Sequence, residues 1–477
     1  MSGANKPTYE ELQDRVVFLE QLVQRLEAIV NEQNERIKKL ENDLAKYRKN
    51  SSNSSKPPSS DIVKPPKEQK ENSGRKIGAQ PGHEKHWRPL FKAEHIDGIH
   101  THTLACCPVC NGALVPANDS PRVVQQIEIM EAPVRVDEHR GIAYWCERCG
   151  KAHYAPLPPA VEKGGLFGPR MTTIAAYMKG CCHASYSTIQ CFFKDVAGVN
   201  ISRGQLAKIV AKAASAIQTP YMELLNAIPD ESKVNADETG HKENGDKYWT
   251  WCFRADLYVL FRIDKSRGSK VLIDVLGAEF NGVLGCDYFS SYRKYMKDFD
   301  ILVQFCIAHL IRDIKFLATV PDKATNAYAE RLLDEIRGMF DIIHRHKAFP
   351  GDSFADALSG QKARILLAAT TDVPDAKPAR NMARRFANHG EAYFQFITTP
   401  GMEPTNNIAE QAVRFVVIDR LITQGTRSEK GRRWCERIWS VMATCAIQNR
   451  SPFTFLLDAI NSFFAGEAPP SLLPSPL

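Results

Sequence analysis

The segments KVNADETG, at residues 233–240, and GVLGCDY, at residues 282–288, decide how the fold of this sequence is interpreted. In both, a short strand-like run leads up to an aspartate, Asp237 in the first and Asp287 in the second. We therefore expect the two aspartates at the ends of neighbouring strands, facing one another across a few ångströms. Two carboxylates placed in this way repel unless a cation lies between them, and Mg²⁺ (or Mn²⁺) favours such oxygen ligands.

A third carboxylate lies in the segment EPTNNIAEQAVR, at residues 403–414, which has the pattern of a helix. Glu410 shares a helix face with Arg414, four residues later. Three carboxylates that hold two Mg²⁺ ions are a known arrangement for in-line attack on phosphodiesters. Plainer interpretations exist, because an aspartate at a strand end is more often a turn or cap residue, and Glu410 with Arg414 also fits a surface ion pair.

The surrounding pattern predicts a multidomain protein that combines an α/β domain with helical parts. Strand-like runs lie at residues 234–237, 248–254, 257–263, 282–287 and 301–307. Helical periodicity lies at residues 292–345, 352–396, 406–418 and 433–448. Trp249 and Trp251, on one face of a strand, are expected in the core. The Pro/Ser-rich tail at residues 466–477 is expected to fray.

Composition excludes several classes of protein. The chain has 477 residues, enough for about three domains, and 43% of them are hydrophobic. No stretch approaches the ~18 uninterrupted apolar residues of a membrane-spanning helix, and the polar N-terminus is unlike a signal peptide. The net charge of +7 is a mild basic excess, which permits an anionic partner without requiring one. We expect a cytosolic protein with no membrane partner.

Cysteine spacing predicts a Zn²⁺ site. The 13 cysteines do not form the dense, evenly counted set of a secreted disulfide framework. Four of them form two Cys-x-x-Cys pairs, Cys107 with Cys110 and Cys146 with Cys149, on either side of the 35 residues 111–145. Two such pairs complete a tetrahedral structural site with no open position for a substrate.

This zinc site is expected to hold together a small β-rich domain, a zinc ribbon, at residues 98–160. Its strands are expected at residues 123–129, 134–136 and 142–145. A module of this length has little core, so metal binding would supply much of its folding free energy. Cys106 is an adjacent spare thiol, and His102 is a less favoured substitute ligand.

Residues 12–47 carry a heptad pattern. Its two seam positions are filled by Leu12, Leu19, Leu26 and Leu40, and by Val16, Val23, Val30, Ile37 and Leu44. The pattern predicts a parallel two-stranded coiled coil over residues 8–48, and so a homodimer or a higher oligomer. A single amphipathic helix packed on its own protein is the alternative.

Three further segments suit contacts with nucleic acid. The Pro/Ser-rich and then basic linker at residues 49–97 either lies along phosphates or acts as a solvated tether. The helical region at residues 166–228 contains a helix, a turn at Gly198 and a helix capped by Ser202, which fits a helix-turn-helix and equally a plain hairpin. A basic cluster suits phosphate contacts or a solvated loop, and it consists of Arg427, Lys430, Arg432 and Arg433.

Several motifs follow one another along nearly the whole chain. They are SSNSSKPPSS at 51–60, GAQPGH at 78–83, the two Cys-x-x-Cys pairs, ADET at 236–239, CDYFSSY at 286–292, CIAH at 306–309 with Arg312, and NNIAEQAVR at 406–414. This ordered set resembles the insertion sequence 66 family of bacterial transposases. The resemblance implies an RNase H-like catalytic domain at residues 229–450, with a helical insertion at about 320–400, and then a C-terminal helix and tail at 451–477.

By this resemblance Asp237, Asp287 and Glu410 take the places of a DDE triad, separated by 50 (287 − 237) and 123 (410 − 287) residues. The triad would hold two Mg²⁺ ions, which activate water and later a DNA 3′-hydroxyl and stabilise the leaving 3′-oxygen. His309 and Arg312, one helical turn apart, would lie near the scissile phosphate, although a core or capping role fits them equally.

The chain departs from the family pattern next to the third carboxylate. Gln411 stands where the family usually has an arginine, and EPT at residues 403–405 stands where an aspartate or a similar residue precedes the asparagine pair. Glu403 is therefore a rival third ligand. Glu238 is likewise a rival to Asp237, because the two are adjacent.

The resemblance implies a DNA transposase that binds the ends of its insertion sequence and inserts them into target DNA. It also implies small accessory proteins encoded beside it, and action in the bacterial cytoplasm, on the nucleoid when bound to DNA. Two other functions stay open. One is a catalytically inactive, zinc-containing DNA-binding or assembly protein, and the other is an RNase H-fold nuclease that cuts without joining.

Overall fold

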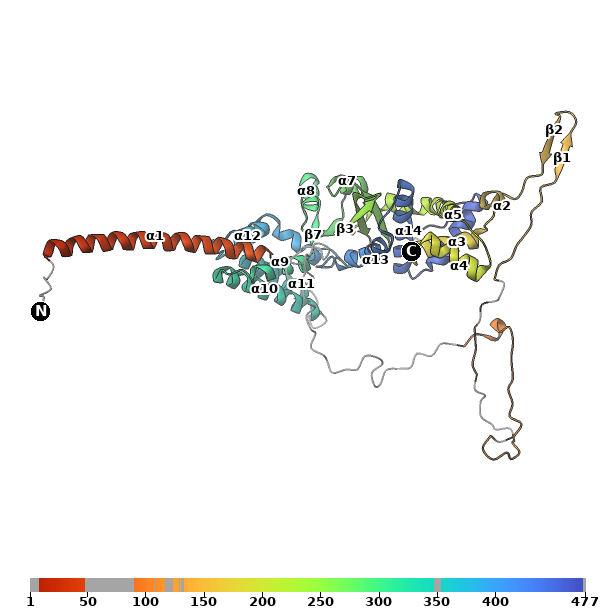
Figure 1. The fold of residues 1–477 in the computed structure, drawn as a ribbon, viewed down its shortest axis with the longest axis horizontal. Helices are drawn as coiled ribbons and strands as arrows, with labels where there is room; N and C mark the ends of the chain where they lie inside the picture. The colour runs from red at the N-terminus through yellow and green to blue at the C-terminus, as the bar shows by residue number, and fades with distance from the viewer. Residues whose placement is uncertain are drawn as a thin grey trace, which may run out of the picture.

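The protein has a mixed α/β architecture (Figure 1). The structure is a computed structural model, and it describes residues 8–47, 90–106, 108–115, 123–127, 129, 133–346 and 353–474. A five-stranded sheet lies at the centre of the largest part, with helices packed around it. No helix among the described residues is long and apolar enough to span a membrane.

The central sheet has the strand order β5-β4-β3-β6-β7. Its strands form at the five strand-like runs of the sequence and are β3 (Lys233–Glu243), β4 (Asp246–Arg254), β5 (Val259–Asp264), β6 (Val283–Cys286) and β7 (Val303–Phe305). The expectation that Asp237 ends its strand is wrong, because pairing with β4 continues β3 past Asp237 to Glu243. Strands β3, β4 and β5 pair antiparallel, whereas β6 is parallel to β3 and β7 is parallel to β6. Asn244 and Gly245, with φ angles of 52° and 94°, form the tight turn between β3 and β4 that this residue pair favours.

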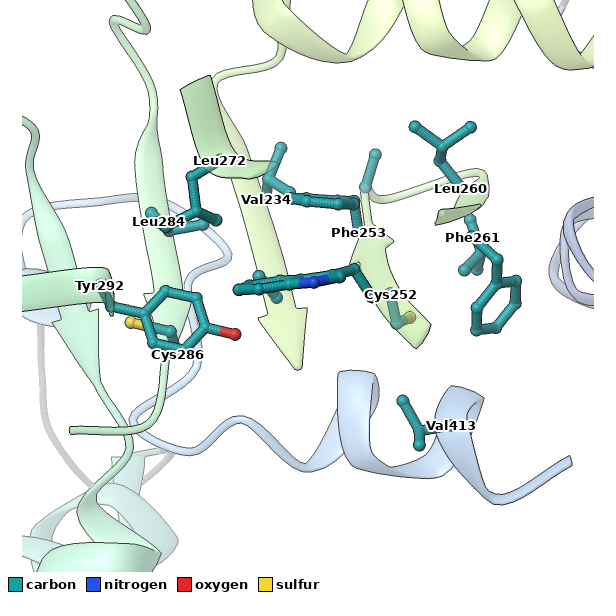
Figure 2. Close-up of a cluster of buried hydrophobic side chains, with 14 of the residues drawn as sticks. Val234, Cys252, Phe253, Leu260, Phe261, Leu272, Leu284, Cys286, Tyr292 and Val413 are labelled. Carbon is teal, nitrogen blue, oxygen red and sulfur yellow. The ribbon is translucent and has the colours of Figure 1, made fainter. Parts of the chain in front are cut away.

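Apolar side chains from the sheet and from helices on both of its faces form one buried core. Val234 of β3 and Leu284 of β6 are fully buried, and so is Trp251, as the sequence led us to expect. Figure 2 shows Leu272 of α7 (Lys270–Leu276) on one side of these strands and Val413 of α13 (Asn407–Thr423) on the other. The sheet is thus covered on both faces.

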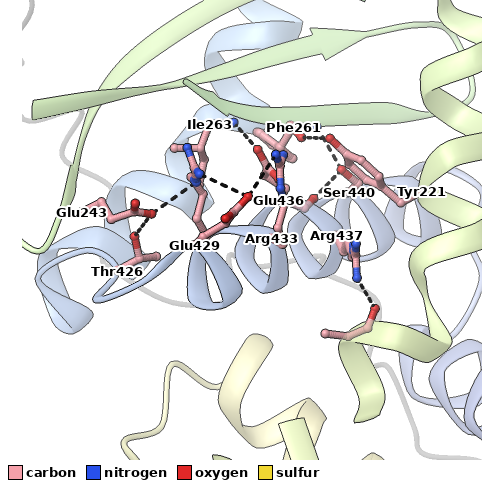
Figure 3. A network of polar contacts seen from close by, with 12 residues as sticks. Tyr221, Glu243, Phe261, Ile263, Thr426, Glu429, Arg433, Glu436, Arg437 and Ser440 are labelled. Atoms are coloured by element: carbon pink, nitrogen blue, oxygen red, sulfur yellow. Dashed lines mark hydrogen bonds and ion pairs between the residues drawn. The ribbon is translucent and has the colours of Figure 1, made fainter. Parts of the chain in front are cut away.

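The edge strand β5 is covered by α14 (Glu429–Ile447), whose polar side chains bond to the backbone of the strand (Figure 3). Three helix residues one turn apart accept hydrogen bonds from alternate strand residues: Glu436 from the Ile263 N–H (2.8 Å), Ser440 from the Phe261 N–H (2.9 Å) and Thr444 from the Val259 N–H (3.1 Å). The spacings match because four helix residues rise about 6 Å and two strand residues about 6.6 Å.

Replacing Glu436 with alanine is expected to destabilise the protein by about 3 kcal/mol or more. The substitution removes the buried acceptor of the Ile263 N–H and the carboxylate that lies 2.9 Å from Arg433. Glu436→Gln keeps an acceptor oxygen and should lose less. Denaturant unfolding measures the effect, with Glu429→Ala as control, since the Glu429 side chain is 67% exposed on the same helix. An unchanged midpoint for Glu436→Ala would contradict the role of this bond.

A helical unit precedes the sheet in the sequence and packs against the C-terminal helices. Its helices are α2 (Pro159–Gly164), α3 (Pro169–Gly180), α4 (Tyr186–Ala197), α5 (Arg203–Ala216) and α6 (Gln218–Ala227), with α15 (Pro452–Ala465) beside them. The helix, glycine turn and capped helix expected from residue 186 onward are confirmed. Gly198 ends α4 with a φ of 66°, and Ser202 Oγ accepts the Gln205 N–H at 3.2 Å to cap α5.

The C-terminal tail is packed against the protein, and the expectation that it frays is wrong for residues 466–474. Leu472 is fully buried, and its carbonyl accepts a hydrogen bond from Gln448 Nε2 at 2.7 Å. The Ser471 hydroxyl donates to Glu223 at 2.7 Å. Leu472 lies in the core and Leu473 packs against it, and these contacts anchor the segment, which its Pro/Ser-rich composition does not reveal.

Helices fill the chain between β7 and α13. They are α9 (Ile307–Leu317), α10 (Lys323–His344), α11 (Ser353–Thr370) and α12 (Lys377–His389), followed by the short 3₁₀ turns η5 (Gly390–Tyr393) and η6 (Gln395–Ile397). The two ends of this stretch meet, because the Ile307 N–H donates to the Pro404 carbonyl at 2.9 Å. The helices therefore leave the sheet and return to it at one place.

The N-terminal helix α1 (Tyr9–Tyr47) confirms the helix expected over residues 8–48. Its seam side chains are exposed, with Leu19 at 55% and Leu40 at 62%, so the seam is not packed on the described part of this chain. The coiled coil itself stays a prediction. Most of the expected linker, residues 49–89, lies outside the described residues.

Only the last of the three strands expected at residues 98–160 forms. The hairpin of β1 (Ala143–Cys146) and β2 (Lys151–Tyr154) is present, but residues 123–127 and 134–136 form no strand. Val124 is 75% and Val136 88% exposed. Among the described residues their β-branched side chains have neither a partner strand nor a core to pack on, and strand propensity alone does not suffice.

Candidate active site beside two parallel strands

The register of β3 and β6 sets Asp237 beside Asp287. In this parallel pair Asn235 lies opposite Gly285, an offset of 50 residues (285 − 235). The same offset separates Asp237 from Asp287, two residues further along each segment. Asp237 Oδ1 accepts the next N–H of the chain at 2.9 Å, and Asp287 Oδ1 accepts the N–H two residues on at 2.8 Å. These local hydrogen bonds thus fix both carboxylates side by side next to strands β3 and β6.

Asn406 docks the start of α13 against this edge. Its side chain is buried, with Oδ1 accepting from Asn235 Nδ2 and Nδ2 donating to the Ala236 carbonyl, both at 2.8 Å. The Asn406 carbonyl accepts the Glu410 N–H at 3.2 Å in the first turn of the helix. Glu410 is thereby close enough to Asp237 for its charge to act on that carboxylate. Asn406 is the first residue of the asparagine pair before Glu410, but the sequence alone did not indicate this contact.

The three carboxylates repel one another in a partly buried site. Burial, and then the charges of Glu238, Asp287 and Glu410, raise the pKa of Asp237 well above its usual range. Burial also raises the pKa of Asp287. Glu410 Oε1 is buried and has no hydrogen-bond partner among the described residues. A divalent cation with oxygen ligands would relieve each of these effects, so the chemistry of the donors fits Mg²⁺. Among the described residues the three carboxylates do not form a group whose ligand atoms all lie within 4.8 Å of one another, whereas Glu410 forms such a group with Cys306 and His309.

The two rival carboxylates are placed differently. Glu238 bonds away from the triad: Arg267 Nε donates to its Oε1 at 2.9 Å, and the Tyr292 hydroxyl donates to its Oε2 at 2.5 Å. Burial, and then the charge of Asp287, raise the pKa of Glu238 to about 7 despite these two donors. Glu403 is exposed. These positions favour Asp237 and Glu410 over their rivals as metal ligands.

His309 and Arg312, on one face of α9, both approach Glu410. His309 Nδ1 lies 3.6 Å and Arg312 Nη2 lies 3.8 Å from Glu410 Oε1. Burial, followed by the charge of Arg312, lowers the pKa of His309 to about 4, so its ring is neutral at pH 7. Cys306, His309 and Glu410 offer ligand atoms within 4.8 Å of one another. Burial raises the pKa of the Cys306 thiol, which makes it a poor metal ligand.

Helix α12 supplies a cation that no sequence pattern singled out. Arg385 Nη1 lies 2.9 Å from Asp313 Oδ2, and its guanidinium lies 3.8 Å from the centroid of the Tyr288 ring. Its charge opposes the effect of burial on the pKa of Asp287. The helices between β7 and α13 thus contribute to the electrostatics of the site. A single arginine in an amphipathic helix carries no signal of such a role.

The basic cluster expected to contact DNA divides in two. Arg432 Nε lies 3.3 Å from Glu243 and Arg433 Nη1 lies 2.9 Å from Glu436, so both arginines form ion pairs within the protein. Arg427 and Lys430 are exposed, as is Arg414. Sequence spacing cannot separate the two kinds, because all four residues lie within seven positions of one another.

Part of the expected zinc site comes together on the β1–β2 hairpin. Ligand atoms of Cys146, Cys149 and His153 lie within 4.8 Å of one another, with Cys149 Sγ 3.1 Å from His153 Nε2. Two thiols and an imidazole fit Zn²⁺. Cys110 is exposed and does not belong to this group, and Cys107 lies outside the described residues. The Cys-x-x-Cys pattern missed His153, whose signal is its place four residues after Cys149.

Two sequence families match the chain. The family described as "Transposase IS66 family" matches residues 164–433, which is more than half of the 477 residues. A "Family of unknown function (DUF6444)" matches residues 4–89. The first match contains the whole central sheet and the three carboxylates.

Two similar proteins come from Sinorhizobium fredii (strain NBRC 101917 / NGR234). The "Uncharacterized protein y4qI" is 24% identical over 306 residues, which are 56% of this chain and 54% of that protein. The "Uncharacterized protein y4hP" is 20% identical over 395 residues, which are 74% of this chain and 70% of that protein. The chain thus spans about half the length of the first relative.

Proposed function

Because the chain belongs to the IS66 family of transposases, we propose that it cuts the ends of its insertion sequence and joins them to target DNA. The observation that carries this proposal is the parallel pairing of β3 with β6, in which Asn235 lies opposite Gly285 and Asp237 is aligned with Asp287. Glu410, anchored at the same edge through Asn406, supplies the third carboxylate of the proposed triad.

The sheet supports an RNase H-like catalytic domain at residues 229–450. Its order, β5-β4-β3-β6-β7, joins an antiparallel hairpin sheet to two parallel strands, and this agrees with that fold. Helices α10, α11 and α12 lie in the sequence between Asp287 and Glu410, where the proposed helical insertion belongs. The remaining domain boundaries stay predictions from the sequence.

In the proposed reaction Asp237, Asp287 and Glu410 would hold two Mg²⁺ (or Mn²⁺) ions. When bound, the ions activate water or a DNA 3′-hydroxyl and stabilise the leaving oxygen. The parallel register aligns the two aspartates, and Asn406 anchors the start of α13, which carries Glu410, at the same edge of the sheet. Arg312 adds a positive charge, 3.8 Å from Glu410, that suits a phosphodiester.

Other parts of the chain support an assembly on DNA. The exposed seam of α1 supports a parallel coiled coil and at least a homodimer. The capped helices of residues 166–228 and the exposed side chains of Arg427 and Lys430 suit contacts with the terminal repeats. Small accessory proteins and action at the bacterial nucleoid, in the cytoplasm, follow from the family as part of the same proposal.

The β1–β2 hairpin is proposed to belong to a zinc ribbon, and purified full-length protein should contain about one Zn²⁺ per chain. Cys146→Ser should lower the bound zinc severalfold, because Cys146 lies with Cys149 and His153 in one group. Metal analysis of His153→Ala beside Cys110→Ser identifies the remaining ligands. Wild-type protein purified without a chelator that holds no zinc would contradict the site.

The function is tested with a plasmid that carries the ends of the insertion sequence. Wild-type protein with its accessory proteins and Mg²⁺ should cut the ends and join them to a target, and chelation should stop both steps. Cutting without joining would identify an RNase H-fold nuclease. Binding of the ends without cutting would identify an inactive DNA-binding or assembly protein.

A further inference from the structure

Arg267, in the loop between β5 and α7, is held beside the candidate active site. Its Nε and Nη2 lie 2.9 Å and 2.8 Å from Glu238 Oε1. Its guanidinium lies between two aromatic rings, 3.8 Å from the centroid of Phe289 and 4.4 Å from that of Trp249. Trp249, which was expected in the core, is half-buried and packs against it, and its ring also contacts this cation. The guanidinium plane is therefore fixed.

The loop that carries Arg267 is itself well bonded. Its two ends are tied by Ser266, whose N–H donates to Asp264 Oδ1 at 2.8 Å and whose Oγ accepts the Gly268 N–H at 2.9 Å. Trp251 Nε1 donates to the Ser266 carbonyl at 3.1 Å. The Arg267 carbonyl accepts from the Ser291 hydroxyl. Arg267 is thus positioned at both its backbone and its side chain.

The partners of Arg267 adjoin the proposed metal ligands. Glu238 follows Asp237 in the chain, and Phe289 comes two residues after Asp287. The Glu238 side chain is 2% exposed, whereas that of Arg267 is 34% exposed. A guanidinium carries five N–H donors, and the contacts with Glu238 occupy only its Nε and Nη2 side. The remaining donors are available at the surface next to the carboxylates.

We propose that Arg267 binds a non-bridging oxygen of a DNA phosphodiester that passes the three carboxylates. The proposal rests on the proposed function, because it supposes DNA at this site. A stacked and tethered guanidinium loses little conformational freedom when it binds, and its planar donors suit phosphate. Its positive charge also offsets the repulsion between the carboxylates and the DNA backbone.

The test measures DNA binding without metal, so that no cleavage intervenes. Fluorescence anisotropy in buffer that contains no Mg²⁺ or Mn²⁺, and no chelator that would also remove Zn²⁺, follows two labelled duplexes, one from the terminal repeat and one of scrambled sequence. Arg267→Ala should weaken binding severalfold on both, because a phosphate contact carries no sequence information. The slope of log K against log salt concentration should fall in magnitude by about one.

A matched control is Arg331→Ala on α10. Arg331 also lies over an aromatic ring, 5.7 Å from the centroid of Tyr328, and its side chain is 39% exposed. The Arg331→Ala variant should bind both duplexes with the wild-type affinity and the wild-type slope of log K against log salt concentration. A paired variant, Arg267→Gln with Glu238→Gln, removes the buried charge together with its partner. It should fold like the wild type and show the same loss of slope as Arg267→Ala.

An unchanged affinity and slope in the folded paired variant would overturn the inference, and Arg267 would then serve only to neutralise Glu238. If the wild type cuts and joins DNA in the plasmid assay, that result leaves the proposed function intact. If the wild type binds neither duplex even with its accessory proteins, both the inference and the proposed function fail.

Discussion

Alanine at Asp237, at Asp287 or at Glu410 is expected to lower cleavage and joining of the insertion-sequence ends by a factor on the order of 10³ or more. Each substitution removes one oxygen donor from a set in which the three charges act on one another. The measurement is the rate of metal-dependent cutting and strand transfer in the plasmid assay. The three residues are expected to act as a unit, so each of the three single variants should lose nearly all of the activity.

Glu403→Ala is the matched comparison for Glu410→Ala, since Glu403 is exposed in the same segment and should leave the rates near those of the wild type. Joining that survives Glu410→Ala but is lost in Glu403→Ala would move the third ligand to Glu403. Joining that survives all three triad substitutions would remove the DDE mechanism altogether.

Removing the charge of Asp237 should raise the stability of the protein even though it removes its activity. Burial and the neighbouring carboxylates raise the pKa of Asp237 in the folded protein. The folded state therefore holds a proton more tightly than the unfolded chain, whose aspartates titrate near 4. In metal-free protein this contribution to stability is complete below pH about 4 and is lost as the pH rises through the raised pKa.

Asp237→Asn should consequently be more stable than the wild type at neutral pH in EDTA, and the difference should vanish in acid. Thermal unfolding at several pH values measures it. If the variant is inactive and also more stable, its inactivity cannot be explained by unfolding. A metal-free Asp237→Asn that unfolds more easily at neutral pH would contradict the electrostatic account of the site.

Acidic substitutions in the seam of α1 are expected to turn the full-length protein into a monomer at micromolar concentration. Leu19→Asp with Leu26→Asp would place charges at two successive seam positions that pack in a dimer, where a buried, unpaired charge costs several kcal/mol. Both side chains are more than half exposed in the single chain, so its own fold loses nothing. Light scattering after size-exclusion chromatography measures the mass.

The matched control is Gln21→Asp with Ala28→Asp, which adds the same charges to the face of α1 opposite the seam. It should keep the mass of the wild type. A wild type that is already monomeric would end the coiled-coil hypothesis. If the seam variant is monomeric but still joins DNA at the wild-type rate, dimerisation through α1 is not needed for the reaction.

The two aspartates could be anticipated from the sequence because their positions follow from local rules. A strand-like run that ends in an aspartate is visible within eight residues, and both runs lie in the same sheet. Glu410 is different. Its place depends on the bond from Asn406 to the Ala236 carbonyl, 170 residues away in the chain, and no local pattern encodes that contact.

Arg267 and Trp249 show why the rest of the site was not foreseen. Spacing along the strand placed Trp249 on the same face as the buried Trp251, which suggested a core residue. The ring is partly buried and packs against the core, and it also contacts a cation from a different loop. His153 was missed in the same way, because it becomes a ligand candidate only when β2 folds back along β1 and brings it to Cys149.

The strands predicted near residues 123 and 134 failed for the reverse reason. Their composition is right for a strand, but a strand is stabilised by its neighbours, and none of the described residues pairs with them. The tail was misjudged because one leucine outweighed its composition. In both cases the deciding contact was tertiary.

Because α14 covers the edge of the sheet at β5, several copies of the protein can lie close together without pairing through that edge. Proteins that gather in several copies on one DNA molecule meet at high local concentration, where a bare strand edge invites another chain to extend the sheet and aggregate. Here Glu436, Ser440 and Thr444 already accept the outward N–H groups of β5. On the opposite edge the Gln304 side chain bonds to the Tyr393 carbonyl at 3.0 Å and the Phe396 N–H at 2.9 Å. In the proposed assembly on DNA, neighbouring copies should therefore remain separate folded units, and the central sheet of one copy should not extend that of another.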